Sequence, residues 1–261
     1  RELEKEHGAR RNWVWFELGK SPLTDSLQYL VQMAAKSQEA YSTVSIDSIQ
    51  NYYTTQGFNI DQHMRKALAA VKTEKDKEIV KSMIQLFYQP WIENMTYKFQ
   101  KLVAQDSGIF TAQTATQETE TYVLFVDAFR YELAEEFAKR LEKQKLKVSL
   151  QASWSAIPSL TPTSKPNVSP IATTVSTQST ITEFRPQLQN GKDLQTQAFR
   201  DALKAAEFKL VTHANDIQTE GKHWQEIGDI DTKGHEEQAD MVKRIDELFD
   251  QVQEALDVAF E

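Results

Sequence analysis

The segment that most constrains the fold is an apolar run that ends abruptly at an acidic residue. Residues 122–126 read YVLFV, and Asp127 follows directly. A continuous run of β-branched and aromatic residues is typical of a strand buried on both faces, as in a parallel sheet. Ligands of such sheets bind beyond the carboxyl ends of the strands. Asp127 therefore stands where α/β proteins place functional carboxylates.

Beyond this strand, helical and strand patterns alternate. Strands separated by helices of ten or more residues predict βαβ units and a mainly parallel sheet flanked by helices. The fold class expected for residues 122–261 is therefore α/β. We expect a helix at about 132–145, a strand at 148–152, a helix at about 194–206, a strand at 209–213 and a long amphipathic helix from about 236.

The residues before this region predict a different architecture. Apolar residues recur at spacings of three and four through much of residues 1–110, which is typical of amphipathic helices. Residues 111–121, TAQTATQETET, lack large apolar side chains and are predicted to be a linker. We expect a helix starting at Ser21 and Pro22, a second stopped by Gly57, a third starting at Asp61 and a longer one bent near Pro90.

Composition limits the chemistry and the location. The chain has no cysteine, so a metal would have to be held by Asp, Glu, His or hydroxyl oxygen. A net charge of −8 disfavours direct DNA binding, although a local basic patch or a cation could bind phosphate. No apolar run suits a membrane span or a signal peptide, which predicts a cytoplasmic protein with no membrane partner. The absence of an initial methionine and of a helix stop signal at the end suggests an excised fragment.

Three short segments are candidates for chemistry. Asp127 is either the N-cap of the following helix or a metal ligand or general base. Residues 156–165, AIPSLTPTSK, are either a turn-rich loop or the source of a nucleophilic hydroxyl that a metal must activate, since no histidine lies nearby. Residues 228–238, GDIDTKGHEEQ, are either a turn and a helix with acids in its first turn, or a loop that wraps a cation through Asp231 and His235.

The order of the three segments resembles that of the motifs in the alkaline phosphatase superfamily, and their residues are most similar to those of its PglZ-domain branch. The residues that carry the resemblance are VDAFRYE at 126–132, IPSLT at 157–161 and DTKGH at 231–235. It covers about residues 121–261, so that 122–261 would be the N-terminal part of an incomplete alkaline-phosphatase-like domain. Residues 1–110 loosely resemble the helical region that precedes this domain in larger PglZ proteins of bacterial phage defence.

The resemblance implies a two-metal phosphoryl-transfer site. Asp127 and Thr161 would share one divalent metal, Asp231 and His235 would hold the other, and Thr161 would be the nucleophile. The metals implied are zinc ions, with manganese as an alternative. Arg130 is expected to be structural rather than a phosphate clamp.

One part of the superfamily pattern is missing. No Asp-His-Gly triplet occurs in the chain, and no histidine follows His235. We therefore expect residues beyond the fragment to complete the site, and metal binding and activity of the fragment alone to be weak or absent.

The function expected from this resemblance is that of a metal-dependent phosphohydrolase or phosphodiesterase, nuclease-like, in BREX-type antiphage defence. Its substrate would be a phosphodiester or a nucleotide, and its partners other proteins of the defence system. The alternative is a non-catalytic scaffold of such a complex, docking partners through its helical region.

Overall fold

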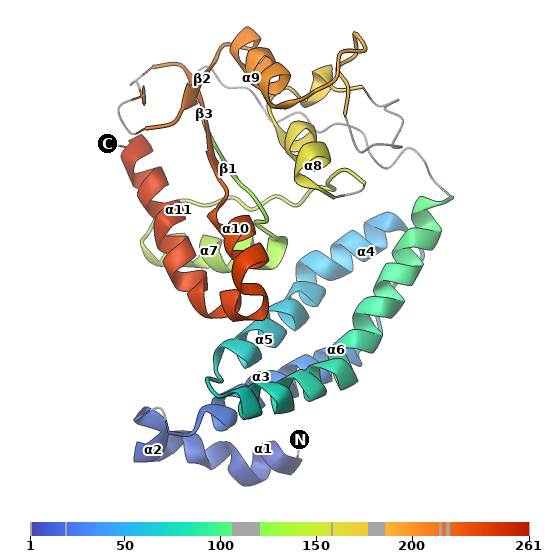
Figure 1. The fold of residues 1–261 in the computed structure, drawn as a ribbon. Coiled ribbons are helices and arrows are strands. Elements are labelled where there is room, and N and C mark those ends of the chain that lie inside the picture. The colour runs from blue at the N-terminus through green and yellow to red at the C-terminus, as the bar shows by residue number, and fades with distance from the viewer. Residues whose placement is uncertain are drawn as a thin grey trace. The chain divides into compact units, whose positions relative to one another are not determined.

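The computed structural model describes residues 2–18, 20–105, 121–157, 159–176, 186–213, 216–217 and 220–260. The protein is a mixed α/β structure, mostly helical, with a three-stranded parallel sheet flanked by helices (Figure 1). It divides into two compact units, each built from several stretches of chain. The predicted linker, 111–121, lies outside the described residues except for Thr121, which begins the first strand.

The first unit contains residues 1–106, 130–150 and 234–246 and is built from helices. Its core gathers Met33, Tyr52, Ile60, Trp91 and Met95. The predicted all-helical character of the N-terminal region therefore holds for its described residues. The helices of this unit are α1 (Glu2–His7), η1 (Gly8–Asn12), α2 (Val14–Glu17), α3 (Pro22–Ser37), α4 (Ile46–Tyr52), the π-helix η2 (Tyr53–Gly57), α5 (Phe58–Ala69), α6 (Glu74–Val103), α7 (Tyr131–Lys143) and η6 (Gln238–Arg244).

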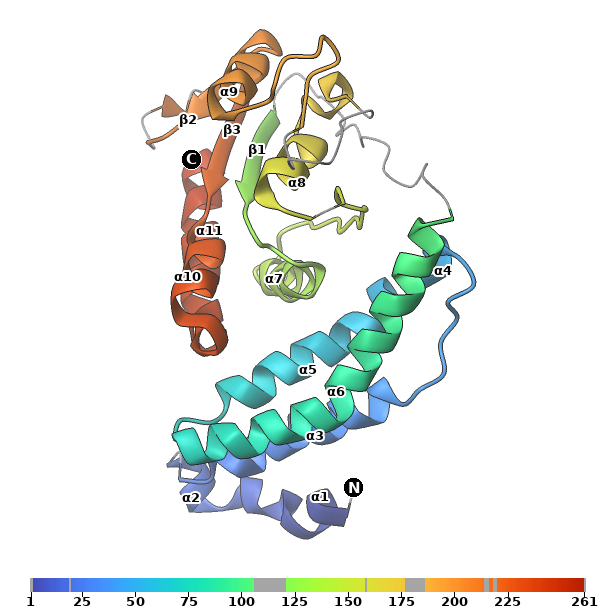
Figure 2. The same ribbon diagram turned by 45° about the vertical axis from the view of Figure 1, so that its right-hand side comes forward.

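One helix boundary and one helix bend follow the sequence prediction. Helix α3 has Ser21 at its N-cap and Pro22 in its first turn, where the missing proline N–H has no helical acceptor to lose. Helix α6 contains Pro90, and Figure 2 shows the helix bent about midway along its length. A proline inside a helix removes one backbone hydrogen bond and crowds the preceding turn. The predicted bend is therefore confirmed.

The predicted stop at Gly57 is wrong. The chain continues from α4 through the π-helix η2 directly into α5, and Gly57 is buried with helical backbone angles. A Cβ atom at this position would lie 3.1 Å from the Tyr53 ring and 3.2 Å from the Tyr52 ring. Glycine thus serves close packing here. Asp61 does not start a helix either: it lies inside α5 and is buried.

The second unit contains residues 107–129, 151–233 and 247–261 and carries the sheet. The strand order is β1-β3-β2, and both pairings are parallel. In both views α8 and α11 lie on opposite sides of the sheet, as is usual for parallel sheets (Figures 1 and 2). The elements are β1 (Thr121–Val126), α8 (Thr161–Val168), η3 (Ala172–Thr174), α9 (Thr196–Ala205), β2 (Phe208–Val211), β3 (Lys222–Ile227) and α11 (Ile245–Phe260); the unit boundary falls within α10 (Asp229–Glu237).

The core of this unit forms between α9 and one face of the sheet. Phe199 and Leu203 of α9 are buried against Phe208 of β2 and Trp224 of β3, and Phe125 of β1 packs against the same cluster. Each large apolar side chain buried in this way contributes about 1.5–3 kcal/mol. The cluster therefore fixes how the helix lies on the strands.

The sequence predicted the two outer strands of the sheet, β1 and β2, but not the central one. The segment 148–152 is not a strand. Its Leu150 is 41% exposed, so this large apolar side chain is not buried as the predicted strand required. The central strand is instead β3, KHWQEI, which sequence reasoning missed because charged and polar residues interrupt its pattern. The six residues of β1 are only partly buried, since β1 is an edge of the described sheet.

Two segments for which a loop was one of the interpretations are helical. Residues 161–168 form α8 with Pro162 in the first turn, a position that tolerates proline. Residues 229–237 form α10 without a break at Gly234, so the predicted cation-wrapping loop is wrong. In the described parts of the chain we find no helix with the length and apolarity needed to traverse a bilayer.

The role assigned to Gly57 predicts a stability change. We expect Gly57→Ala to destabilise the protein by about 1–2 kcal/mol, because overpacking against buried aromatic rings outweighs the gain in helix propensity. Gly234→Ala is the matched control, since its Cβ atom would meet only Met241 at 3.9 Å. Urea unfolding measures both, and a Gly57→Ala protein as stable as the wild type would contradict the packing role.

Candidate functional site

Asp127 lies at the carboxyl tip of β1 and is held by the sheet. Its N–H donates to the Ile227 carbonyl at 2.8 Å, and its Oδ1 accepts from the Ala128 N–H at 2.9 Å. Ala128 has a φ of 57°, a left-handed conformation uncommon for a non-glycine residue. The N-cap of α7 is Arg130, so the interpretation of Asp127 as the helix N-cap is wrong.

Thr161 lies against this carboxylate. It is the first residue of α8, and its Oγ1 donates to Oδ2 of Asp127 at 3.0 Å. The other hydroxyls of the predicted loop have different partners: Thr163 donates to the Leu160 carbonyl at 2.9 Å, and Ser164 contacts Ser159 at 3.5 Å. The structure therefore brings together one of the predicted pairs of site residues. Pro158 of the same motif lies outside the described residues.

A cavity of about 440 Å³ lies beside Thr161. Lys165, one helical turn after Thr161 on α8, lines it together with Phe199 and Thr196 of α9. The Lys165 ammonium is paired with Glu226 at 2.9 Å. Sequence reasoning missed Lys165, because the proline-rich segment did not predict the helix in which a spacing of four from Thr161 places both residues on one face.

Asp231 and His235 lie four residues apart on α10. Asp231 is in the first turn, where the helix dipole favours an acid, and is partly buried, while His235 is exposed. The plain interpretation of this segment, a helix with acids in its first turn, is confirmed. The proposed role of the two side chains as metal ligands stays a prediction.

The tip of β1 offers two possible metal ligands among the described residues. Asp127 and Thr161 supply one carboxylate and one hydroxyl at the strand tip. Nowhere in the described ranges do three or more His, Asp or Glu side chains form a group that could hold a metal ion. Zinc sites need three or four ligands. The residues described here do not by themselves fit the implied pair of metals.

The residues that follow Asp127 in the VDAFRYE motif take part in a buried ionic cluster of the first unit. Glu132 of α7 is fully buried and pairs with Arg65 of α5 at 3.3 Å and with Arg130 at 2.7 Å. Arg65 also pairs with Glu136. Burial raises the pKa of Glu132, against the pull of Arg65 and Arg130. Arg130 thus neutralises a buried acid, which supports the expected structural role.

A second hydrogen-bonded cluster lies on the same helices. The carboxylate of Asp61 accepts hydrogen bonds from the hydroxyls of Tyr53 and Tyr88, the latter at 2.7 Å. Burial raises the pKa of both hydroxyls, and the charge of Asp61 raises it further. The buried Asp61 is therefore satisfied by neutral donors, and its place inside α5 is explained by tertiary contacts rather than by helix initiation.

No family model, curated protein or solved structure matches the chain. The resemblance to PglZ domains is therefore carried by the motifs alone. What the structure adds is the contact between two of these motifs, the strand-tip acid and the threonine.

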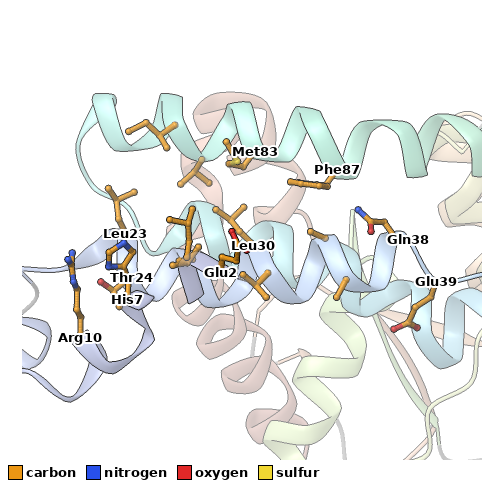
Figure 3. Close-up of a pocket in the computed structure, with 17 residues that line it drawn as sticks. Glu2, His7, Arg10, Leu23, Thr24, Leu30, Gln38, Glu39, Met83 and Phe87 are labelled. Atoms are coloured by element: carbon orange, nitrogen blue, oxygen red, sulfur yellow. The ribbon is translucent and has the colours of Figure 1, made fainter. Parts of the chain in front are cut away.

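The helical unit also presents a large apolar groove of about 1160 Å³ (Figure 3). Leu30 and Val31 of α3, Met83 and Phe87 of α6, and Leu3 of α1 line it. Met83 is 38% exposed. Figure 3 shows Arg10 toward one end of the groove and Glu39 toward the other.

The buried cluster predicts a strong effect of removing Glu132. We expect Glu132→Ala to destabilise the protein by about 3–5 kcal/mol, because it leaves the buried Arg65 without one of its carboxylate partners. Glu142→Ala, at an exposed position of the same helix, should change stability by less than about 0.5 kcal/mol. Urea unfolding of the two variants compares them, and equal midpoints would refute the role of the cluster.

Proposed function

We propose that the chain carries part of the phosphoryl-transfer site of a PglZ-type phosphohydrolase acting on phosphodiesters or nucleotides in antiphage defence. The observation that supports the proposal is the hydrogen bond from Thr161 to Asp127, because it joins two motifs separated by more than thirty residues. A hydroxyl that donates to a carboxylate at a strand tip has the arrangement of a nucleophile with its base. An alkaline-phosphatase-like fold for the second unit is part of the same proposal.

The reaction proposed for these residues has two steps. Oγ1 of Thr161 attacks phosphorus and forms an O–P bond, its proton passes to Asp127, and the ester O–P bond breaks so that the leaving oxygen departs with the bonding electrons and takes a proton from solvent. A water oxygen then attacks the phosphorus of the phosphothreonine and forms a new O–P bond, while the bond between phosphorus and Oγ1 of Thr161 breaks. Oγ1 takes back the proton held by Asp127, and the proton lost by the water passes to solvent. The hydrogen bonds at the tip of β1 support this proposal, because the Asp127 N–H donates to the Ile227 carbonyl and the Ala128 N–H donates to Oδ1 of Asp127.

Metal dependence belongs to the proposal only through the resemblance. The described residues do not fit a metal pair, so no step is assigned to one here. A divalent metal at this position would need ligands in addition to Asp127 and Thr161. Asp231 and His235 stay the proposed candidates for a second metal.

Hydrolysis of bis(4-nitrophenyl) phosphate by the full-length protein, with zinc or manganese added, tests the function. We expect Thr161→Ala to lower kcat/KM by roughly a thousandfold or more, because the attacking oxygen is removed. Thr161→Ser keeps a hydroxyl and should retain measurable turnover.

Ser164→Ala is the matched control for the nucleophile, since Ser164 lies on the same helix and does not contact Asp127. Its activity should match that of the wild type. Full activity of a folded Thr161→Ala protein, checked by circular dichroism, would overturn the proposed function.

The apolar groove of the helical unit favours a second candidate function, a scaffold that binds a partner protein. We propose that its occupant is an amphipathic helix of another protein of the defence system. Apolar grooves between helices bind such helices through residues spaced by three and four. The negative carboxyl end of the bound helix would lie toward Arg10 and its positive amino end toward Glu39.

The scaffold function is tested with a fluorescent designed amphipathic peptide of about four helical turns. We expect it to bind the chain, and Met83→Glu to abolish binding because a charge enters the apolar groove. Val44→Glu is the control, since Val44 is 83% exposed and does not line the groove. Absence of binding, or a dimer of the chain that Met83→Glu converts to monomer, would overturn this occupant.

A further inference from the structure

The cavity beside Thr161 is built from both helices that pack near the sheet. Thr161 and Lys165 come from α8, and Thr196 and Phe199 come from the first turn of α9. Its volume of about 440 Å³ lies within the range of about 300–1,000 Å³ typical of small-molecule sites. Thr161, the proposed nucleophile, thus lines a cavity large enough for a small-molecule substrate.

A chain of contacts fixes the position of Lys165. The Trp224 indole N–H donates to Oε1 of Glu226 at 2.9 Å, and Oε2 of Glu226 accepts from the Lys165 ammonium at 2.9 Å. The ammonium also lies 5.9 Å from the centroid of the Phe125 ring and 5.4 Å from that of Phe199. Trp224 is itself buried in the core of the sheet. The Lys165 side chain is therefore held against the sheet by Glu226 of β3 and Phe125 of β1.

This geometry leaves Lys165 able to bind an anion. An ammonium group carries three N–H donors, and Glu226 accepts from one. Among the described residues of the cavity wall, Lys165 supplies the cationic side chain and Asp193 the acidic one. The acidic residue in turn is engaged by Gln187, whose amide donates to it at 3.0 Å.

We infer that Lys165 binds the phosphoryl group of the substrate in this cavity, and that the apolar wall receives an ester group of the same phosphate. The inference rests on the proposed function, because a phosphorus atom attacked by Thr161 would lie one helical turn from Lys165. Leu194, Phe199 and Pro166 provide the apolar wall. The ligand class is therefore a phosphate ester with an apolar or aromatic ester group, such as an aryl or nucleoside phosphate.

Binding of inorganic phosphate and of phenyl phosphate to the full chain, measured by isothermal titration calorimetry, tests the inference without requiring turnover. We expect phenyl phosphate to bind more tightly than inorganic phosphate. Lys165→Met should weaken both by about tenfold to a hundredfold, the usual range for loss of a charged hydrogen bond. Lys165→Arg should retain most of the affinity because it keeps the charge.

Two further variants separate binding from a structural role. Lys204→Met, at an exposed position near the end of α9, should leave both affinities unchanged. Glu226→Gln removes the carboxylate that competes for Lys165, so phosphate should bind more tightly. If Lys165 only supported the fold through Glu226, both Lys165→Met and Glu226→Gln would weaken binding. That result, or equal affinities for Lys165→Met and Lys204→Met, would overturn the inference.

Turnover of Thr161→Ala and phosphate binding of Lys165→Met together distinguish the nucleophile from the phosphate contact. If Thr161→Ala abolishes turnover while Lys165→Met leaves phosphate binding intact, the nucleophile stands and the phosphate contact falls. If Lys165→Met abolishes phosphate binding while Thr161→Ala turns over normally, the anion site stands and the threonine chemistry falls. Absence of phosphate binding to the wild-type chain would overturn the inference directly.

Discussion

The interaction on which the helical unit most depends is the buried pairing of Arg65 with Glu132. Loss of either partner would leave a buried charge with only part of its compensation, because Arg65 would keep Glu136 alone and Glu132 would keep Arg130 alone. The pairing attaches the start of α7 to α5, through two residues that lie 67 positions apart in the chain. It also accounts for half of the VDAFRYE motif: the acid at 127 faces a hydroxyl, whereas the arginine and the acid at 130 and 132 serve the fold.

Local patterns predicted the elements whose own residues specify them. The apolar run of β1, the periodic faces of α7 and α9, and the proline at the start of α3 were all visible in the sequence. The strand that was missed depends on distant residues, because β3 is specified by its two neighbours in the sheet. The contacts of Gly57 are nearer in the sequence, with the Tyr52 and Tyr53 rings, but the residue pattern alone does not show that a helix continues through the glycine.

The candidate site divides in the same way. The motifs were enough to select Asp127 and Thr161 as candidate site residues, and the structure places their side chains in contact. Lys165 could not be selected in advance, because a proline-rich segment gave no reason to expect a helix that would bring it one turn from Thr161. Its partner Glu226 lay in a strand that the pattern concealed. Because the position of the Lys165 ammonium depends on Glu226 of this strand, the structure was needed to identify it.

The left-handed backbone at Ala128 has a consequence for how this tip of the sheet can vary. A residue with a Cβ atom is strained in that conformation, and a β-branched residue would be strained most. Glycine would relieve the strain but would also loosen the turn that aims the preceding carboxylate. Variation at this position should therefore favour small side chains and asparagine, because a change that relieves the strain by freeing the backbone also frees the Asp127 carboxylate to turn away from Thr161.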